Sequence, residues 1–286
     1  MTLVGLLGEG ITTSLTPPMH RRESSRLGLD YEYRIIDTAI SRRPMAELPR
    51  IIAEVADEGY DALNVTHPFK QRIIPYLDEL TPDAAELGAV NLVVYTDGRT
   101  TGHNTDWTGF SFALREGLGS VRGDRVLQVG AGGAGAATSF ALLRSGVAAL
   151  AIIDRDDQQA NLLAARLNDL FPGTDVLVIS MGEFDRAIRG VDGVVHATPT
   201  GMLHNPGLPF SLDAVPRDAW VSDVVYLPLE TALVRGARER GHRVLDGGLM
   251  AVGQAVDSIR IITGREPDAS RMRADFLQLV EEEMAP

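Results

Sequence analysis

The stretch VLQVGAGGAGAA, residues 126–137, decides the fold of this chain. Its apolar start is typical of a buried strand, and Gly130, Gly132 and Gly135 then follow in the spacing G-x-G-x-x-G, where a helix should begin. The first glycine permits a tight turn, the second lets the backbone approach a pyrophosphate, and the third lets the helix pack closely on the strand. The N–H groups at the start of the helix can donate hydrogen bonds to the anion.

The pattern therefore predicts a dinucleotide-binding turn. Close packing of a helix start rich in glycine and alanine would give the same spacing without a ligand. The strand before the turn and the helix after it favour the binding function. The predicted cofactor-binding residues of the turn are Gly130, Ala131, Gly132, Gly133, Ala134 and Gly135.

An acidic residue follows at the distance that this motif requires. The next strand, expected at residues 148–154, ends in Asp154, 24 residues after Gly130. A carboxylate there accepts hydrogen bonds from the adenosine ribose hydroxyls and repels a 2′-phosphate, whereas Arg155 could favour the phosphate. The acids that follow in DRDD add to the repulsion. We predict that the cofactor is NAD rather than NADP, and that Asp154 and Arg155 help to bind it.

Strands and helices alternate regularly outward from this turn. Six strands over about half of the chain predict a doubly wound sheet. They are expected at residues 125–130, 148–154, 175–180, 192–198, 219–226 and 242–247. The N-terminal part alternates in a similar way, which favours a second α/β unit with a mostly parallel sheet. Its strands are expected at residues 2–8, 31–37, 61–66 and 89–96, and its helix at residues 46–59.

Two further helices, expected at residues 248–264 and 268–285, follow the last strand of the doubly wound sheet. That sheet is then complete, so we expect these helices to pack on the N-terminal unit. The predicted first domain is residues 1–105, completed by C-terminal helices within residues 247–286. The predicted second domain is residues 106–246, with a cleft between the two.

Bulk composition excludes several classes of function. The 286 residues carry a net charge of −12, which argues against a nucleic-acid-binding surface. The chain has no Cys, and its six His are scattered without an H-E-x-x-H pair, so we predict no metal site. The N-terminus lacks a basic signal-peptide region, and no apolar run approaches the roughly 18 residues of a membrane span. We therefore expect a cytoplasmic protein without a membrane partner.

The segment LNVTHPFK, residues 63–70, ends in the only lysine of the chain. Asp106 follows a short strand and begins a helix at the predicted domain junction. A lysine beside an aspartate can exchange a proton with a hydroxyl group, and an arginine cannot. A solvated lysine and a helix N-cap aspartate would explain each residue taken singly. Because every other basic side chain is arginine, we predict that Lys70 and Asp106 form a catalytic acid–base pair.

Seven motifs in the chain occur in the order found in shikimate dehydrogenases, and the resemblance covers essentially its whole length. The motifs are SLTPPMH, NVTHPFK, GAVN, GHNTD, GAGGAG, DVVYLPLET and MAVGQA. With Asp154, the chain most resembles the NAD-dependent quinate/shikimate dehydrogenase branch. The resemblance implies an N-terminal α/β substrate domain, a Rossmann NAD-binding domain, and C-terminal helices that return to the first domain.

The resemblance also implies roles for individual residues. Lys70 and Asp106 match the catalytic pair of the family. The residues that match its substrate-binding positions are Ser14, Thr16, Asn64, Thr66, Asn91, Tyr226 and Gln254. Thr16 replaces a serine usual in enzymes dedicated to shikimate and resembles members that accept quinate. His196 stands where many relatives have asparagine, and we assign it no role from the sequence.

The reaction implied is reversible oxidation of the C3 hydroxyl of quinate or shikimate to the 3-dehydro product. The partner is thus a small cyclic polyol carboxylate, and the chain is expected to be a monomer or a homodimer. A strict shikimate dehydrogenase of aromatic amino-acid biosynthesis, or a relative acting on an amino-substituted ring, is an alternative. A non-catalytic NAD-binding sensor would need the glycine-rich turn but gives no reason for Lys70 and Asp106.

Overall fold

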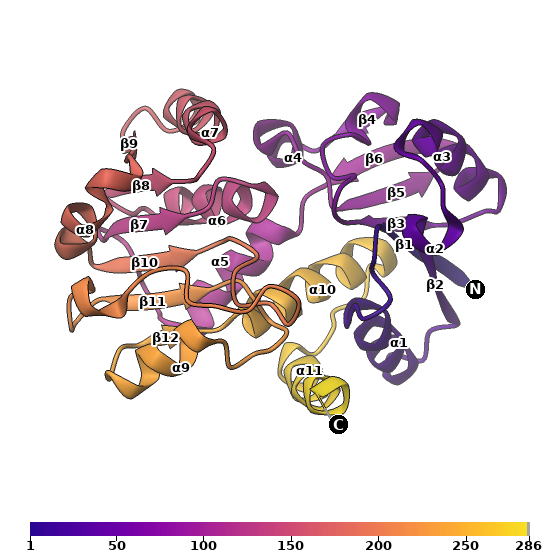
Figure 1. The fold of residues 1–286 in the computed structure, drawn as a ribbon. Coiled ribbons are helices and arrows are strands. Elements are labelled where there is room, and N and C mark those ends of the chain that lie inside the picture. Colours follow the sequence, from indigo (N-terminus) through magenta and orange to yellow (C-terminus); the bar gives the residue numbers. More distant parts are fainter. Residues whose placement is uncertain (285–286) are drawn as a thin grey trace. The chain divides into compact units, whose positions relative to one another are not determined.

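The structure is a computed structural model that describes residues 1–284. The chain divides into two compact units (Figure 1). The first consists of Met1–Thr105 together with the C-terminal residues from Gln254, and the second is Asp106–Gly253. Within residues 1–284, no helix is both long enough and apolar enough to cross a membrane.

The first unit contains a six-stranded sheet in the order β2-β1-β3-β5-β6-β4. Its strands are β1 (Thr2–Gly8), β2 (Tyr31–Asp37), β3 (Ala62–Val65), β4 (Glu79–Leu80), β5 (Leu92–Thr96) and β6 (Arg99–His103). The pairs β1–β2, β1–β3 and β4–β6 are parallel. The pairs β3–β5 and β5–β6 are antiparallel. The sheet is therefore parallel on one side, as expected, and antiparallel where β5 joins it.

A tight turn explains the antiparallel part. Asp97 and Gly98, between β5 and β6, both have positive φ, 50° and 74°. Positive φ at both central residues defines the hairpin turn whose twist matches that of the flanking strands. The Asp-Gly pair therefore reverses the chain, and β6 lies antiparallel to β5.

Helices pack around this sheet, and the first and last of them, which are far apart in the sequence, contact each other. They are α1 (Thr16–Arg26), α2 (Thr38–Ser41), α3 (Leu48–Asp57), α4 (Pro82–Leu87), the end of α10 (Gly247–Thr263), and α11 (Ala269–Met284). Short 3-10 helices are η1 (Met45–Glu47) and η2 (Ile74–Tyr76). α3 buries Ile51, Ile52 and Val55 against Leu63 and Val93 of the sheet. α11 packs on α1, so the C-terminal helix completes the first unit.

The second unit contains a six-stranded, fully parallel sheet in the order β12-β11-β10-β7-β8-β9. Its strands are β7 (Arg125–Val129), β8 (Ala149–Ile153), β9 (Asp175–Val178), β10 (Gly193–His196), β11 (Trp220–Asp223) and β12 (Val244–Leu245). In Figure 1 they lie one above another from β9 to β12. The order reverses between β7 and β10, as the predicted doubly wound sheet requires. Ligands bind at such a switch point, beyond the carboxyl ends of the strands.

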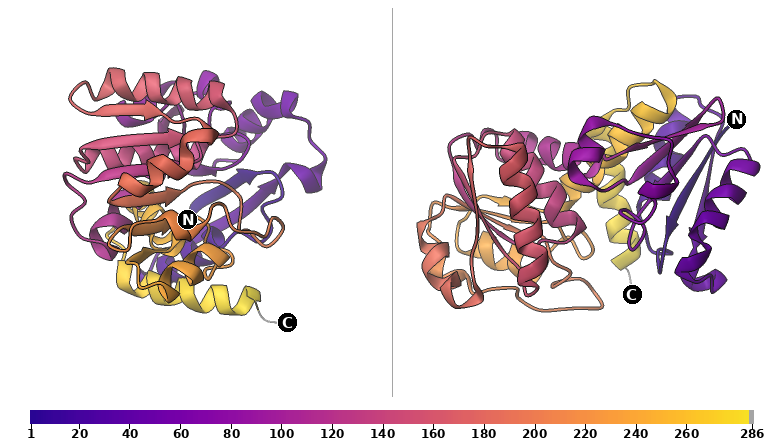
Figure 2. Two further views of the ribbon diagram at one scale, coloured as in Figure 1. Left: turned by 60° about the vertical axis from the view of Figure 1, so that its left-hand side comes forward. Right: turned by 90° about the horizontal axis from the view of Figure 1, so that it is seen from above.

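Helices precede, connect and follow the strands of this unit. They include α5 (Asp106–Gly117), α6 (Gly133–Arg144), α7 (Asp157–Leu170), α8 (Phe184–Ala187), α9 (Ala232–Glu239) and the start of α10. Short 3-10 helices are η3 (Met181–Glu183), η4 (Ile188–Gly190) and η5 (Leu212–Ala214). α7 lies along β8 and β9 (Figure 2). Its N-cap, Asp156, accepts hydrogen bonds from the backbone N–H groups of Gln158 and Gln159, which fixes where α7 begins.

Candidate active site

Polar residues of the first unit gather at the carboxyl ends of β1 and β3. These parallel neighbours end at the same edge of the sheet. The loop after β1 meets the turn after β3, because the Glu9 N–H donates to the His67 carbonyl at 3.1 Å. The Val90 N–H donates to the Lys70 carbonyl at 2.8 Å, which ties that turn to the segment before β5. The fold thus brings the Lys70 turn, Thr66 and Asn91 to one edge.

The loop after β1 carries Ser14 and leads into Thr16, the first residue of α1, and a buried carboxylate shapes this loop. Asp37, at the end of β2, accepts hydrogen bonds from the N–H groups of Gly10 (3.0 Å) and Ile11 (2.8 Å). A third bond comes from the Ala39 N–H at 2.9 Å. Burial alone would raise the pKa of Asp37, but backbone hydrogen bonds to the ionised form outweigh it and lower the pKa. Asp37 is therefore a charged anchor for this loop.

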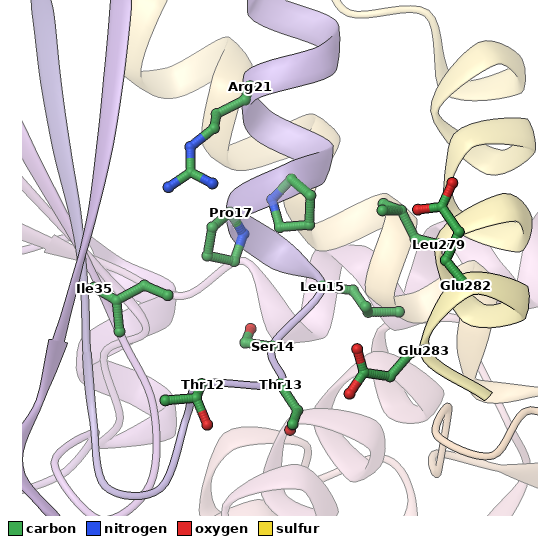
Figure 3. Close-up of a pocket in the computed structure, with 11 residues that line it drawn as sticks. Thr12, Thr13, Ser14, Leu15, Pro17, Arg21, Ile35, Leu279, Glu282 and Glu283 are labelled. Atoms are coloured by element: carbon green, nitrogen blue, oxygen red, sulfur yellow. The ribbon is translucent and has the colours of Figure 1, made fainter. Parts of the chain in front are cut away.

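Ser14 lies at the end of this loop, just before α1. Its hydroxyl accepts a long hydrogen bond, 3.4 Å, from the N–H of Thr16. Ser14 is half-buried and lines a pocket of about 270 Å³ together with Thr12, Thr13 and Arg21 (Figure 3). The Arg21 guanidinium donates to the Tyr33 carbonyl at 2.7 Å and is thereby held against β2.

Two buried amides lie beside the Lys70 turn. Asn64, in β3, and Asn91, just before β5, are 3% and 4% exposed. The Val65 N–H donates to the Asn91 carbonyl at 2.8 Å, so the two residues are close neighbours. Buried amides need partners for all their polar atoms, and here they find them in one shared network.

The predicted catalytic pair is divided between the two units. Lys70 is half-buried in the turn after β3, in the first unit. Asp106 is buried at the first position of α5, in the second unit. Both have interactions within the chain. Their pairing remains a prediction.

The other predicted substrate residues are half-buried. Thr66 follows β3 directly, and Gln254 lies in α10 where the chain re-enters the first unit. Tyr226 follows β11 in the second unit. The substrate role of each of these residues remains a prediction.

In the glycine-rich turn between β7 and α6, close packing alone is enough to require glycine at two positions. Gly130 has φ of 111°, and a Cβ there would lie 2.6 Å from the Ala197 carbonyl oxygen. A Cβ at Gly135 would lie 2.2 Å from the Gly130 oxygen. Gly132 is different, because a Cβ there would meet no other protein atom within 4 Å. Gly132 also lines a pocket, so its lack of a side chain keeps that wall open to a ligand.

Gln128, in β7, organises this turn and was not identified from the sequence. Its buried Nε2 donates to the carbonyls of Gly130 and Gly135, both at 2.9 Å. Its Oε1 accepts from the Thr138 hydroxyl at 2.8 Å. A glutamine inside the otherwise apolar strand VLQV is the signal that could have indicated this role.

Asp154, directly after β8, also contacts the turn. One carboxylate oxygen accepts from the Ala131 N–H at 2.7 Å, and the other accepts from the Asp156 N–H at 2.9 Å. A carboxylate has about four acceptor positions, so two are left for further donors. Asp154 lines a pocket of about 550 Å³ with Arg155, Gly130 and Gly132. A dinucleotide, with its ribose hydroxyls and phosphates, fits this set of groups.

A buried histidine supports another wall of the same pocket. His196, at the end of β10, contacts Asp223 through Nδ1 at 2.9 Å and the Thr198 hydroxyl through Nε2 at 2.5 Å. Because the carboxylate only accepts hydrogen bonds, Nδ1 carries the hydrogen. Asp223 also accepts from the Thr231 hydroxyl at 2.7 Å. His196, without a role in the sequence analysis, therefore holds Thr198, which lines the pocket.

A doubly wound sheet with this turn, joined to an α/β unit with a polar strand edge, defines a dinucleotide-dependent dehydrogenase. Residues 6–93 match the model of the shikimate dehydrogenase substrate binding domain. The chain is 48% identical over 278 residues to a shikimate dehydrogenase (NADP(+)) of Pseudarthrobacter chlorophenolicus, covering 97% of this chain and 95% of that one. The chain belongs to the shikimate dehydrogenase family.

Two further relatives carry the name quinate. A quinate/shikimate dehydrogenase (NAD(+)) of Corynebacterium efficiens is 46% identical over 278 residues, covering 97% of this chain and 98% of that one. The structure of quinate dehydrogenase from Corynebacterium glutamicum in complex with NAD has a TM-score of 0.91 and 43% identity. That match covers 97% of this chain and 99% of the other. Relatives of similar identity are thus named for either nucleotide.

Proposed function

We propose that this chain is an NAD-dependent quinate/shikimate dehydrogenase that oxidises the C3 hydroxyl of its substrate. The first unit supplies the substrate-binding residues except Tyr226, and the second binds the cofactor. The observation that carries the proposal is the polar edge at the ends of β1 and β3. There the only lysine of the chain lies in a turn tied to the segment that holds Asn91.

The proposed chemistry follows from the residue types. In the oxidation, neutral Lys70 accepts the hydroxyl proton, while the Asp106 carboxylate orients Lys70 by accepting a hydrogen bond from its amine. Bound NAD supplies the hydride acceptor. Ser14 and Thr16 donate hydrogen bonds to the substrate carboxylate, and the remaining polar residues recognise the ring hydroxyls. These are Asn64, Thr66, Asn91, Tyr226 and Gln254.

The preference for NAD over NADP rests on Asp154. Names of relatives do not decide it, because they include both nucleotides. The Asp154 carboxylate lines the pocket and has acceptor positions beyond its two backbone bonds. Ribose hydroxyls can donate to these positions, whereas a 2′-phosphate would face like charge.

Absorbance of the reduced cofactor tests the proposal directly. Purified chain is mixed with quinate or shikimate and with NAD or NADP, in all four combinations. We expect reduction of NAD with both substrates and a much lower kcat/KM with NADP. Turnover of shikimate alone would favour a strict shikimate dehydrogenase, and a preference for NADP would contradict the role of Asp154. No turnover in any combination would overturn the function.

A further inference from the structure

A buried chain of hydrogen bonds in the first unit joins β2, β3, α10 and the segment before α5. The Tyr33 hydroxyl donates to Asn64 Oδ1 at 3.0 Å. Asn64 Nδ2 lies 3.3 Å from the Ser258 hydroxyl, which lies 3.2 Å from the Thr105 hydroxyl. Thr105 in turn contacts the side chain of Asn91. All five side chains are buried.

The pattern of donors fixes the orientation of Asn64. Its Oδ1 accepts from Tyr33, while its Nδ2 donates to Ser258 and, at 3.4 Å, to the Asn91 carbonyl. Both amide hydrogens are therefore used within the protein, and one acceptor position on Oδ1 is left. Asn64 can consequently meet a substrate only as a hydrogen-bond acceptor, which selects a hydroxyl group that donates.

The same reasoning fixes Asn91. Its Oδ1 accepts from the Thr105 N–H at 2.6 Å, and its Nδ2 donates to the Thr105 hydroxyl at 3.0 Å. The Thr105 hydroxyl is also 3.3 Å from Asn91 Oδ1. The Ser258 and Thr105 hydroxyls lie 3.2 Å apart, and either of them can be the donor. Ser258 accepts from Asn64 Nδ2 and thus links Asn64 to Thr105, and through Thr105 to Asn91.

Ser258 also lies one turn after Gln254 in α10. Residues four apart lie on the same face of a helix. The face that carries Gln254 therefore also carries the hydroxyl that joins the two amides. Ser258 stands apart from Ser24, a buried serine of the same unit whose hydroxyl has no partner within the described residues.

We propose that Ser258 and Tyr33 are positioning residues for substrate recognition, acting through the amides of Asn64 and Asn91. The inference rests on the proposed function. Neither side chain is assigned a contact with the substrate. Tyr33 holds the Asn64 carbonyl oxygen, and Ser258 couples Asn64 to Thr105 and Asn91. Loss of either hydroxyl frees an amide to rotate, so the ring hydroxyls lose an oriented partner.

Ser258→Ala with Ser24→Ala as its control tests the role of the serine. Alanine favours a helix at both sites, so both variants should fold. We expect Ser258→Ala to raise the KM for quinate and shikimate about five- to tenfold, the effect of one lost hydrogen bond. The Kd for NADH should not change, and kcat should fall less than the KM rises. Ser24→Ala should match the wild type, and Ser258→Thr should restore part of the lost affinity because it keeps a hydroxyl.

Tyr33→Phe has its own matched control in Tyr95→Phe, whose buried hydroxyl has no partner within residues 1–284. Tyr33→Phe should raise the KM by a similar factor, and Tyr95→Phe should not. Combining Tyr33→Phe with Ser258→Ala should raise the KM by less than the product of the single effects, because both act through Asn64. If Ser258→Ala and Tyr33→Phe match their controls while the wild type is active, the inference is wrong and the proposed function stands. If the wild type oxidises neither substrate, both fail.

Discussion

At the scale of single residues, the function depends most on Lys70. An arginine guanidinium stays protonated under all ordinary conditions, whereas a lysine amine can release its proton when its environment favours the neutral form. Twenty-six of the 27 basic side chains counted as Lys or Arg are arginine, so nothing in the general usage of this chain explains one lysine. Its position after β3, beside Thr66 and the segment of Asn91, gives a chemical reason for the exception.

Lys70→Ala should lower kcat with quinate and shikimate by about 10²- to 10⁴-fold, the usual contribution of a general base. NADH affinity should be unchanged, because Lys70 is not among the residues that line the cofactor pocket. Lys70→Arg should be nearly as inactive, since it keeps the charge but cannot release a proton. Steady-state kinetics and NADH titration measure both quantities. Arg72→Ala, an exposed basic residue nearby, is the control, and near-normal turnover of Lys70→Ala would remove Lys70 from the mechanism.

Asp154→Asn should shift the cofactor preference toward NADP. The amide oxygen can still accept from the Ala131 N–H, so the turn should keep its shape. The negative charge that repels a 2′-phosphate is lost, and we expect the ratio of kcat/KM for NAD to that for NADP to fall about tenfold or more. Asp169→Asn, exposed in the last turn of α7 and so far along the helix from Asp154, is the control and should leave the ratio unchanged. An unaltered ratio in Asp154→Asn would mean that other groups select the nucleotide.

At the scale of elements, the glycine-rich turn depends on close contact between β7 and α6. Gly135→Ala would place a methyl group 2.2 Å from the Gly130 carbonyl oxygen, and that backbone has to move. We expect a loss of roughly 1–3 kcal/mol in the free energy of unfolding and weaker NADH binding, as for overpacking in a core. At Gly133, in the same turn of α6, an added methyl group would meet no atom within 4 Å. Gly133→Ala should therefore leave the free energy of unfolding unchanged or raise it slightly. Thermal unfolding and NADH titration of the two variants check this; equal stability would contradict the packing argument.

The loop that carries Ser14 and leads into α1 depends on the charge of Asp37. Because its folded pKa lies below the ordinary value, the ionised form stabilises the fold at pH values above that ordinary value. This contribution is lost as the pH falls through the folded pKa. Asp37→Asn should therefore be less stable than the wild type at neutral pH, and its stability should fall less steeply between about pH 5 and pH 2.

Thermal unfolding over this pH range measures the difference, and the KM for the substrate should also rise because the loop is loosened. Asp61 offers a comparison, since within residues 1–284 it accepts a single backbone hydrogen bond, from Leu3. Asp61→Asn should change stability less than Asp37→Asn. Parallel pH profiles for the wild type and Asp37→Asn would show that the carboxylate charge is not the anchor.

Hydrophobic patterns predicted most elements, but not those whose buried faces are polar. The six strands of the second unit were predicted because their apolar runs alternate with amphipathic helices. α1 was not predicted, because its buried residues include His20, Glu23 and Ser24, which give no apolar stripe. The pair Asp97-Gly98 is a hairpin signal in the sequence. The prediction of a mostly parallel sheet in the first unit did not take it into account.

Some residues of the candidate site could likewise be predicted from the sequence, and others could not. Lys70, Asp154 and the glycines stand out by residue type and spacing, so the sequence alone indicated them. Gln128 and Ser258 act through hydrogen bonds to residues brought close by folding, Ser258 to Asn64 across 194 positions of the chain. A glutamine is unusual in its apolar strand, but no local pattern indicates which residues Gln128 or Ser258 contacts. Those contacts form only when the chain folds.

At the scale of the whole molecule, the two ends of the chain meet in the first unit. Glu23 of α1 is fully buried, and it accepts hydrogen bonds from the Arg271 guanidinium of α11 and, at 2.9 Å, from the Asp268 N–H. Asp275 of α11 pairs with Arg26 and Arg22 of α1. The hydrogen bond from Arg26 is the main cause of the lowered pKa of Asp275. The first unit is therefore completed only when the last helix is present.

Glu23→Gln should destabilise the first unit specifically. The substitution leaves the Arg271 guanidinium without its buried counter-charge. In a fully buried pair, such a loss lowers the free energy of unfolding by about 3–5 kcal/mol. Arg271 is partly exposed, so solvent reduces the loss, and we expect roughly 1–3 kcal/mol. Glu282, which like Arg271 lies in α11, is an exposed partner of Arg22 in α1. Glu282→Gln should therefore lower the free energy of unfolding by well under 1 kcal/mol.

Hydrogen exchange separates the two units in this experiment. In Glu23→Gln, amides of α1 and α11 should lose protection, whereas those of α6 and α7 in the second unit should exchange as in the wild type. Both tryptophans, Trp107 and Trp220, lie in the second unit, so their fluorescence follows that unit alone during urea unfolding. Equal loss of protection in all four helices would mean that the two units unfold as one, and that the ion pairs between α1 and α11 stabilise the entire chain.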